Sequence, residues 1–224
     1  MAKLVDARDL KSLERNLVPV RVRPRAPVND NAVHKTMTEK IYISAQELLD
    51  DSFRLAAKIF ESGFRPNFII GIWRGGTPVG IAVQELMDYL NVDTDHIAIR
   101  TSSYTGIGEQ SDFVQVHGLG YIVRNINQED SLLIVDDVFD SGRSIDAVIH
   151  YLTDRTRLNM PHQVRVATPW YKPGNNRTDR VPDYYLHETD KWLVFPHELK
   201  GLTKEEINSG KGAVSDIIKP LVAD

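Results

Sequence analysis

The sequence predicts an α/β fold in which a mainly parallel, twisted sheet is flanked by helices. Short apolar runs of about five residues alternate with longer segments in which apolar side chains recur at helical spacing, as in proteins built of strand–helix–strand units. One apolar run ends in a group of carboxylates, as expected where a parallel sheet binds a polar ligand. The 224 residues suffice for one sizeable core with a small subdomain.

The N-terminal residues 1–40 hold few bulky apolar side chains and are predicted to form an arm that precedes a domain over 41–224. Arg21, Arg23 and Arg25 lie in this arm. Three such residues favour a solvated or subunit-contacting segment over one that binds nucleic acid.

The domain begins with a predicted helix. Ser44 and Glu47 have the spacing of a capping box at its start, and Gly63 is a suitable residue to end it. The apolar residues at helical spacing between them are Leu49, Phe53, Ala56, Ala57 and Phe60.

A short apolar strand over 68–72 and a second helix follow. Thr77 and Pro78 have the residue types of an N-cap and a first helical position. The apolar residues of this helix are Val79, Val83, Leu86, Met87 and Leu90.

Further strands are predicted by short apolar runs at 96–99, 132–135, 163–167 and 192–195. The run at 132–135 is followed by a helix whose apolar residues are Ile145, Val148, Ile149 and Leu152. A last helix is predicted near the C-terminus, with a capping box at Thr203 and Glu206.

Composition excludes several classes of protein. Hydrophobic residues make up 42%, charged residues 26%, and the formal net charge is −4, which gives no support for binding to nucleic acid or to an anionic membrane. The chain has no cysteine, so disulfides, a thiol nucleophile and cysteine metal sites are excluded. No apolar run approaches the roughly 18–20 residues that span a bilayer, and no signal-type core begins the chain. We therefore expect a cytoplasmic protein. The seven histidines lack zinc-type spacing and are interpreted as ordinary.

The most informative stretch begins with the apolar run at 132–135. This run ends in two adjacent carboxylates, Asp136 and Asp137, and a third, Asp140, begins a turn that reaches the next helix near Ser144. The order predicts a buried strand, a turn and a helix, with a polar ligand outside the carboxyl end of the strand.

The turn itself has the residues for binding a phosphate. Gly142 lets the backbone approach closely, and the hydroxyls of Ser141 and Ser144 add donors beside the free N–H groups of a helix N-terminus. The preceding carboxylates would repel a bare phosphate, so hydroxyl groups or a hydrated cation are expected opposite them. A sugar phosphate satisfies both parts of the motif.

This stretch closely resembles the phosphoribosyl-pyrophosphate (PRPP) signature of the type I phosphoribosyltransferases: an apolar strand, two acids, two further residues, then Asp-Thr/Ser-Gly-x-Thr/Ser. The resemblance implies that Asp136 and Asp137 bind the ribose hydroxyls and Mg²⁺. It also implies a 5′-phosphate site formed by Asp140, Ser141, Gly142, Arg143 and Ser144. The alternative is a strand and a capped helix with solvated acids. Neither the P-loop pattern nor the dinucleotide-binding glycine pattern is present.

A second loop of the same family is matched after the strand at 68–72. Paired glycines at this place expose backbone N–H groups to an anion. The resemblance implies a pyrophosphate site at Arg74, Gly75 and Gly76, with Thr77 beside it. Taken alone, the segment is also consistent with a tight turn and a solvated arginine.

Residues 101–118 show little core-forming pattern and are predicted to form a mobile lid, because long irregular segments in compact domains are commonly functional. The family has a Ser-Tyr pair in such a loop, which Ser103 and Tyr104 match. A lid would keep water from capturing a reactive ribosyl centre. The alternative is a plain surface hairpin.

The family's small hood, expected over about 168–200, would recognise the base. Lys172 carries a donor-only side chain that suits a 6-oxo group, and the indole of Trp192 suits stacking on a flat base, which contributes roughly 1–3 kcal/mol. Their order resembles the base-recognition part of the hypoxanthine, guanine and xanthine members, which implies base contacts from Lys172, Trp192 and Leu193. Glu198 loosely matches an acid near the purine 2-position. Taken alone, the two side chains are also consistent with an exposed lysine and a core tryptophan.

The resemblance implies a purine phosphoribosyltransferase that converts a 6-oxopurine and PRPP into a nucleoside 5′-monophosphate and pyrophosphate, with Mg²⁺ as cofactor and Asp140 as general base. Such proteins commonly pair, so a homodimer or homotetramer is expected. Two alternatives stay open. One is a regulator of this fold that binds PRPP or a nucleotide, and the other is an enzyme acting on orotate, uracil or adenine.

Overall fold

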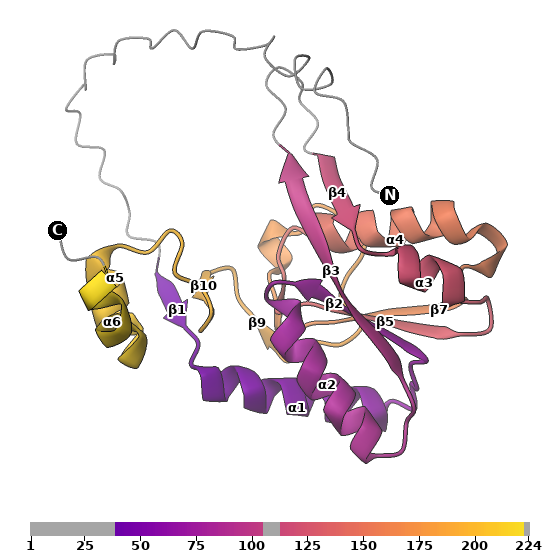
Figure 1. The fold of residues 1–224 in the computed structure, drawn as a ribbon, viewed down its shortest axis with the longest axis horizontal. Coiled ribbons are helices and arrows are strands. Elements are labelled where there is room, and N and C mark those ends of the chain that lie inside the picture. Colours follow the sequence, from indigo (N-terminus) through magenta and orange to yellow (C-terminus); the bar gives the residue numbers. More distant parts are fainter. Residues whose placement is uncertain (1–38, 105–112, 222–224) are drawn as a thin grey trace, which may run out of the picture. The chain divides into compact units, whose positions relative to one another are not determined.

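A computed structural model describes residues 39–104 and 113–221 of the chain (Figure 1). The predicted arm therefore lies outside the described residues except at its end, where Lys40 begins the first strand. The main sheet has five strands in the order β4-β3-β2-β5-β7. Its helices lie on both faces, and the predicted α/β fold class is confirmed.

The strands of the main sheet alternate with helices along the chain. The strands are β2 (Phe68–Trp73), β3 (Asp95–Tyr104), β4 (Phe113–His117), β5 (Ser131–Val135) and β7 (Gln163–Ala167). The helices are α1 (Ala45–Glu61), α2 (Gly76–Tyr89), α3 (Gly120–Asn125) and α4 (Arg143–Thr156), the last extended by the short 3₁₀ helix η2 (Arg157–Asn159). β4 pairs antiparallel with β3, and the other neighbours in the sheet are parallel.

Side chains of the central strands enter two cores. Ile69 and Leu133 pack with α1 and α2 on one face, whereas Ile70 and Ile134 pack with α3 and α4 on the other (Figure 1). A strand buried on both faces needs apolar residues at every position. This burial explains why the run before Asp136 is continuously apolar and does not alternate with polar residues.

Local signals at helix ends are confirmed. Ser44 Oγ accepts a hydrogen bond from the Glu47 N–H at 3.1 Å, and Glu47 Oε2 accepts one from the Ser44 N–H at 2.7 Å. The same reciprocal pair at Thr203 and Glu206 begins α5 (Lys204–Gly210). Gly63, with φ +85°, follows the end of α1, in the conformation that favours glycine after a helix.

Two details of the helices differ from the prediction. The buried apolar side chains of α1 include Leu48, Leu55 and Ile59, whereas Leu49 and Phe53 are 45% and 40% exposed. Both sets have helical spacing, and packing on the sheet decides between them.

The start of the second helix was also predicted wrongly. α2 begins at Gly76 with Gly75 as its N-cap. Thr77 therefore lies inside the first turn, and its buried Oγ1 has no hydrogen-bond partner among the described residues.

The segment predicted as a lid is partly a strand pair. β3 is longer than the predicted strand at 96–99, and its residues 100–104 pair with residues 113–117 of β4. The ends of the segment therefore match the alternative of a hairpin, while residues 105–112 lie outside the described residues.

Two small sheets complete the fold. β6 (Val138–Phe139), β8 (Trp170–Tyr171) and β9 (His187–Glu188) form a parallel sheet, and β1 (Lys40–Tyr42) pairs with β10 (Trp192–Val194). The strand predicted at 192–195 thus lies outside the main sheet. The remaining elements are η3 (Pro173–Asn175), α6 (Ala213–Ile218) and η4 (Lys219–Leu221). None of the helices within the described ranges is long and apolar enough to cross a membrane.

Candidate active site

The register of the two central strands brings two polar loops together. β2 and β5 are parallel neighbours, and Gly71 lies opposite Val135 near their carboxyl ends. The loop that follows β2, at 74–76, therefore meets the acid pair Asp136 and Asp137 that follows β5. The predicted pyrophosphate loop and the predicted ribose acids form one site in the structure.

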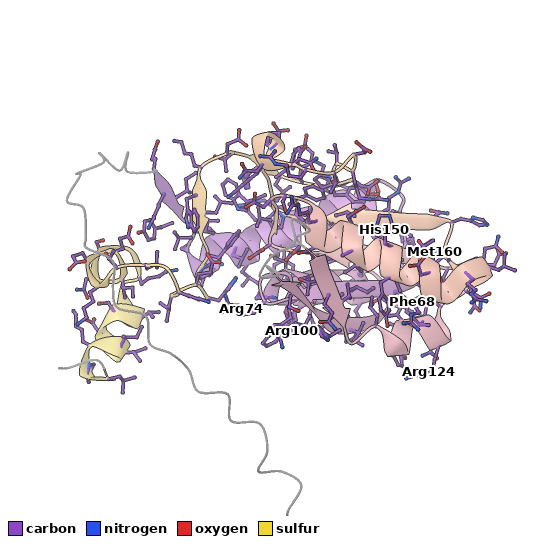
Figure 2. All side chains as sticks on the ribbon, turned by 90° about the horizontal axis from the view of Figure 1, so that it is seen from above. Phe68, Arg74, Arg100, Arg124, His150 and Met160 are labelled. Carbon is purple, nitrogen blue, oxygen red and sulfur yellow. The ribbon has the colours of Figure 1, made fainter. Side chains whose placement is uncertain are left out.

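Both glycines of the pyrophosphate loop are required by this close approach. A β-carbon on Gly75 would overlap the carboxylate of Asp137, and one on Gly76 would overlap the carbonyl oxygen of Val135. The peptide bond between Trp73 and Arg74 is cis. Arg74 itself is exposed at the surface (Figure 2), where its guanidinium is accessible to an anionic ligand.

The acid pair is a concentrated negative charge. Asp136 Oδ1 accepts a hydrogen bond from the Asp137 N–H at 3.0 Å. Burial, and secondly the charge of Asp137, raise the pKa of Asp136 well above its ordinary value, although N–H groups of Asp137 and Gly76 act in the opposite direction. Asp137 is only 8% exposed, and its Oδ2 lies 3.5 Å from His197 Nε2. A bound cation would relieve the repulsion between the two carboxylates.

The donor set fits Mg²⁺ and does not form a cage of protein ligands. Among the described residues there is no group of three or more histidine, cysteine or acidic side chains arranged for a metal ion. Mg²⁺ is usually held by one or two carboxylates, with water and substrate phosphates as its other ligands. Asp136 and Asp137 supply the two carboxylates that such a site needs.

The phosphate turn has the backbone geometry expected of it. Gly142 is the N-cap of α4 with φ +75°, and no side chain of the described residues caps this helix. A β-carbon at this position would also lie 2.8 Å from the ring of Phe139, which is fully buried. The start of α4 borders a hollow of about 200 Å³ lined by Asp136, Asp137, Val138, Phe139, Asp140, Ser141, Gly142, Ser144 and Ile145, at the end of the helix whose dipole favours an anion.

Lys172 is positioned by the small sheet and contacts Asp140, a residue that lines this hollow. β6 follows the acid pair directly and pairs with β8, and the Lys172 N–H donates to the carbonyl oxygen of Phe139 at 2.9 Å. Lys172 Nζ lies 3.3 Å from Asp140 Oδ2. The lysine side chain is 8% exposed, and that of Asp140 is 47% exposed. The alternative of an exposed lysine is therefore wrong, because the Lys172 side chain is buried against Asp140, the acid predicted to be the general base.

The other predicted base-binding residues lie on β10. Trp192 is 54% exposed, so it is not a core residue, and Leu193 is buried. Neither residue lines the hollow. Asp190 Oδ1 accepts a hydrogen bond from the Gly174 N–H at 2.9 Å, which ties the chain just before Trp192 to the turn just after Lys172.

The remaining predicted residues are only partly described. Ser103 and Tyr104 end β3, opposite Val114 and Phe113 of β4, and no side-chain position is described for this predicted lid pair. Arg143 is the first residue of α4 and is exposed.

Two polar residues at the site were missed by sequence reasoning. Asn175 Nδ2 donates to Asp140 Oδ1 at 2.9 Å, an arrangement that depends on the turn at η3 and has no signal in the sequence. His197, interpreted as ordinary, contacts Asp137. Its place just after the predicted strand at 192–195 was the available signal, because ligands bind where strands of the expected α/β sheet end, although the structure places that strand in the small sheet with β1.

The chain is similar in sequence and in structure to known proteins. Residues 40–200 match the model of a family described as the phosphoribosyl transferase domain. Among solved structures, a purine phosphoribosyltransferase from Pyrococcus horikoshii Ot3 is 26% identical with a TM-score of 0.56, covering 73% of this chain and 97% of that chain. A Neisseria gonorrhoeae hypothetical protein with bound ppGpp is 22% identical with a TM-score of 0.59, covering 80% and 98%. A Helicobacter pylori xanthine-guanine-hypoxanthine phosphoribosyltransferase is 19% identical with a TM-score of 0.52, covering 70% and 92%.

Proposed function

The chain belongs to the phosphoribosyl transferase domain family, and we propose that it is a purine phosphoribosyltransferase acting on a 6-oxopurine. The base and PRPP would give a nucleoside 5′-monophosphate and pyrophosphate. The similar purine phosphoribosyltransferase from P. horikoshii supports a purine as the base. We further propose that the protein works in the cytoplasm and that it forms a homodimer or homotetramer. Analytical ultracentrifugation would measure the oligomeric state.

The observation that carries this proposal is the contact of Lys172 Nζ with Asp140 Oδ2 at 3.3 Å. A 6-oxopurine presents an acceptor, O6, beside a donor, the N–H at N7. Lysine only donates hydrogen bonds, and an ionised carboxylate only accepts them. A lysine and a carboxylate side by side are thus complementary to that edge of the base, whereas the 6-amino group of adenine would place a donor against the lysine.

The sugar phosphate half of the proposal rests on the backbone. The N-terminus of α4 would bind the 5′-phosphate, and Asp136 and Asp137 would bind the ribose hydroxyls and Mg²⁺. The metal ion would neutralise pyrophosphate oxygens as a Lewis acid. Arg74 and the N–H groups of Gly75 and Gly76 would stabilise the same negative charge from the protein side.

The bond changes balance without a further reactant. N9 of the base forms a bond to the anomeric carbon while the bond from that carbon to pyrophosphate breaks, and pyrophosphate leaves with the electron pair. The proton on N7 passes to Asp140, which acts as general base. Lys172 holds O6 and stabilises the negative charge that develops on the base.

The direct test incubates the purified protein with PRPP and Mg²⁺ and offers hypoxanthine, guanine, xanthine, adenine, uracil or orotate in turn. We expect nucleoside monophosphate and pyrophosphate, detected by chromatography, with at least one 6-oxopurine and with none of the other three bases. Turnover with adenine, uracil or orotate alone would contradict the proposed base class.

Binding without turnover would instead favour a regulator. Calorimetric titration with PRPP, with the monophosphates and with ppGpp would detect it. The last ligand is included because the similar N. gonorrhoeae protein was solved with ppGpp bound. Tight binding with no product from any base would overturn the enzymatic proposal.

A further inference from the structure

We propose that Asn175 is a positioning residue for the reaction: its side-chain amide holds the carboxylate of Asp140 in the orientation that accepts the proton from the base. This inference rests on the proposed function, in which Asp140 is the general base. It adds a residue that no motif of the sequence indicates.

The two oxygens of Asp140 have different partners. Oδ1 accepts a hydrogen bond from Asn175 Nδ2 at 2.9 Å, and Oδ2 lies 3.3 Å from Lys172 Nζ. The amide contact has ordinary hydrogen-bond length, whereas the lysine contact is long. Asn175 is therefore the closer of the two partners, and it restrains the position of Oδ1.

Asn175 is held in place by its own segment. It is the last residue of η3, and its N–H donates to the carbonyl oxygen of Lys172 at 3.2 Å. Two residues later the Arg177 N–H donates to the carbonyl oxygen of Ser141 at 3.0 Å. A β-carbon on Gly142 would lie 2.6 Å from Thr178 Oγ1, so the segment packs directly on the phosphate turn.

The contacts form a short ladder between two segments. Residues 139, 140 and 141 contact residues 172, 175 and 177 in the same order. The outer two contacts are hydrogen bonds between backbone groups, and the middle contact is the hydrogen bond from the Asn175 side chain to Asp140. A loop anchored on both sides of one residue holds that residue's side chain with little freedom to turn away.

Asp140 needs such a partner because its side chain is 47% exposed. An exposed aspartate has several rotamers of similar energy, and Lys172 would be shared with O6 once the base is bound. The neutral amide of Asn175 can hold one oxygen of Asp140 without neutralising the negative charge that Asp140 needs to act as general base. The other oxygen then stays available to accept the proton.

The test compares Asn175→Ala with Asn176→Ala in the full chain. Asn176 belongs to the same loop, where its side chain contacts the Arg180 carbonyl oxygen and the Thr178 N–H, each at 2.9 Å. For Asn175→Ala we expect kcat to fall on the order of tenfold or more, as for a misplaced catalytic group, with the KM for PRPP changed by less than about twofold. Asn176→Ala should leave kcat much closer to that of the wild type.

Asn175→Asp gives a second readout, the pH profile of kcat. The charged groups that surround Asp140 include Lys172, after β8, and Asp136 and Asp137, after β5, which line the same hollow. A carboxylate at position 175 would add a like charge against Asp140, and like charges raise the pKa of the pair. The acid limb of the profile should therefore move to higher pH. An acid limb that stays at the wild-type pH would show that position 175 does not contact the general base, and the role of Asn175 would be overturned.

The outcomes separate the two proposals. If the wild type makes nucleotide while Asn175→Ala keeps the wild-type kcat, or while Asn176→Ala loses as much as Asn175→Ala, the role of Asn175 is overturned and the proposed function stands. If the wild type makes no nucleotide with any base, the proposed function fails and this inference fails with it.

Discussion

Gly75 lies against Asp137 so closely that a β-carbon on the glycine would overlap the carboxylate. The predicted pyrophosphate loop and the acid pair are therefore a single packed unit, although the two residues lie 62 positions apart in the sequence (137 minus 75). Neither side can move without disturbing the other.

This packing predicts the effect of Gly75→Ala. The extra methyl group must displace Asp137 or the loop, so we expect kcat/KM for PRPP to fall by at least about tenfold and the free energy of unfolding to fall by about 1–3 kcal/mol. Gly80→Ala in the same helix is the matched control, because its β-carbon would meet only the Cα of Gly71 at 3.6 Å. It should be neutral or slightly stabilising. Steady-state kinetics and denaturant unfolding measure both, and equal effects of the two variants would contradict the argument.

The raised pKa of Asp136 predicts how the stability of the metal-free protein depends on pH. Burial and the charge of Asp137 raise this pKa in the folded state, so the folded protein binds the proton more tightly than the unfolded chain. The stability that this group contributes is fully present below its unfolded pKa of about 3.9 and is lost as pH rises through the folded pKa. Asp136→Asn should therefore raise the melting temperature at neutral pH and flatten its decline with pH.

Thermal melts across a pH series check this expectation. Glu85→Gln, at an exposed position of α2, is the control for the loss of one negative charge. A decline with pH that is the same in Asp136→Asn and in the wild type would rule out Asp136 as its source. The same variant should lose PRPP binding, since it gives up one of the two carboxylates.

The role of Asp140 predicts a separation of binding from turnover. Asp140→Asn keeps the shape of the side chain but cannot accept the proton, so kcat should fall on the order of 10²- to 10⁴-fold. The PRPP dissociation constant, measured by calorimetry, should change little, because the proposed phosphate contacts come mainly from the backbone at the start of α4. If Asp140→Asn keeps both turnover and PRPP binding, the role assigned to Asp140 is wrong.

The exposed indole of Trp192 predicts an effect confined to the base. Trp192→Ala would remove the proposed stacking contact, worth roughly 1–3 kcal/mol, which corresponds to a rise of roughly 5- to 150-fold in the KM for the base. Trp192→Phe should retain most of the affinity. The KM for PRPP serves as the internal reference, and a parallel rise in both constants would mean that the substitution acts by disturbing β10 and not by removing a stacking partner.

Sequence patterns predicted the fold and the strand, turn and helix that carry the proposed sugar phosphate site, because these elements are built from consecutive residues. The acid pair, Gly142 and the start of α4 occupy one strand–turn–helix unit, so their spacing in the chain is also their spacing in the structure. That the loop at Gly75 and Gly76 lies beside the acid pair follows from the pairing of β2 with β5. The N-cap of α2 was predicted wrongly, since packing of Gly76 on Val135 moves the helix start and no local propensity records that contact.

The partners of these residues could not be predicted in the same way. Asn175 reaches Asp140 across 35 positions, and His197 approaches Asp137 across 60. Such contacts depend on how β6 pairs with β8 and on where β10 ends. β6 and β8 have two residues each and β10 has three, so these strands are too short to give a periodic pattern in the sequence.

The β6–β8 pairing is short, which affects how the choice of nucleobase could be changed by engineering. Two residue pairs, Val138 with Trp170 and Phe139 with Tyr171, form the strand register between the sugar-binding unit and the segment that carries Lys172. Substitutions beyond Tyr171 that keep the contacts of Asn175 and Arg177 with residues 140 and 141 would thus change the surface proposed to face the nucleobase while the acid pair and the turn before α4 stay as they are. Screening such variants against unnatural heterocycles is a natural starting point for engineering new nucleotide products.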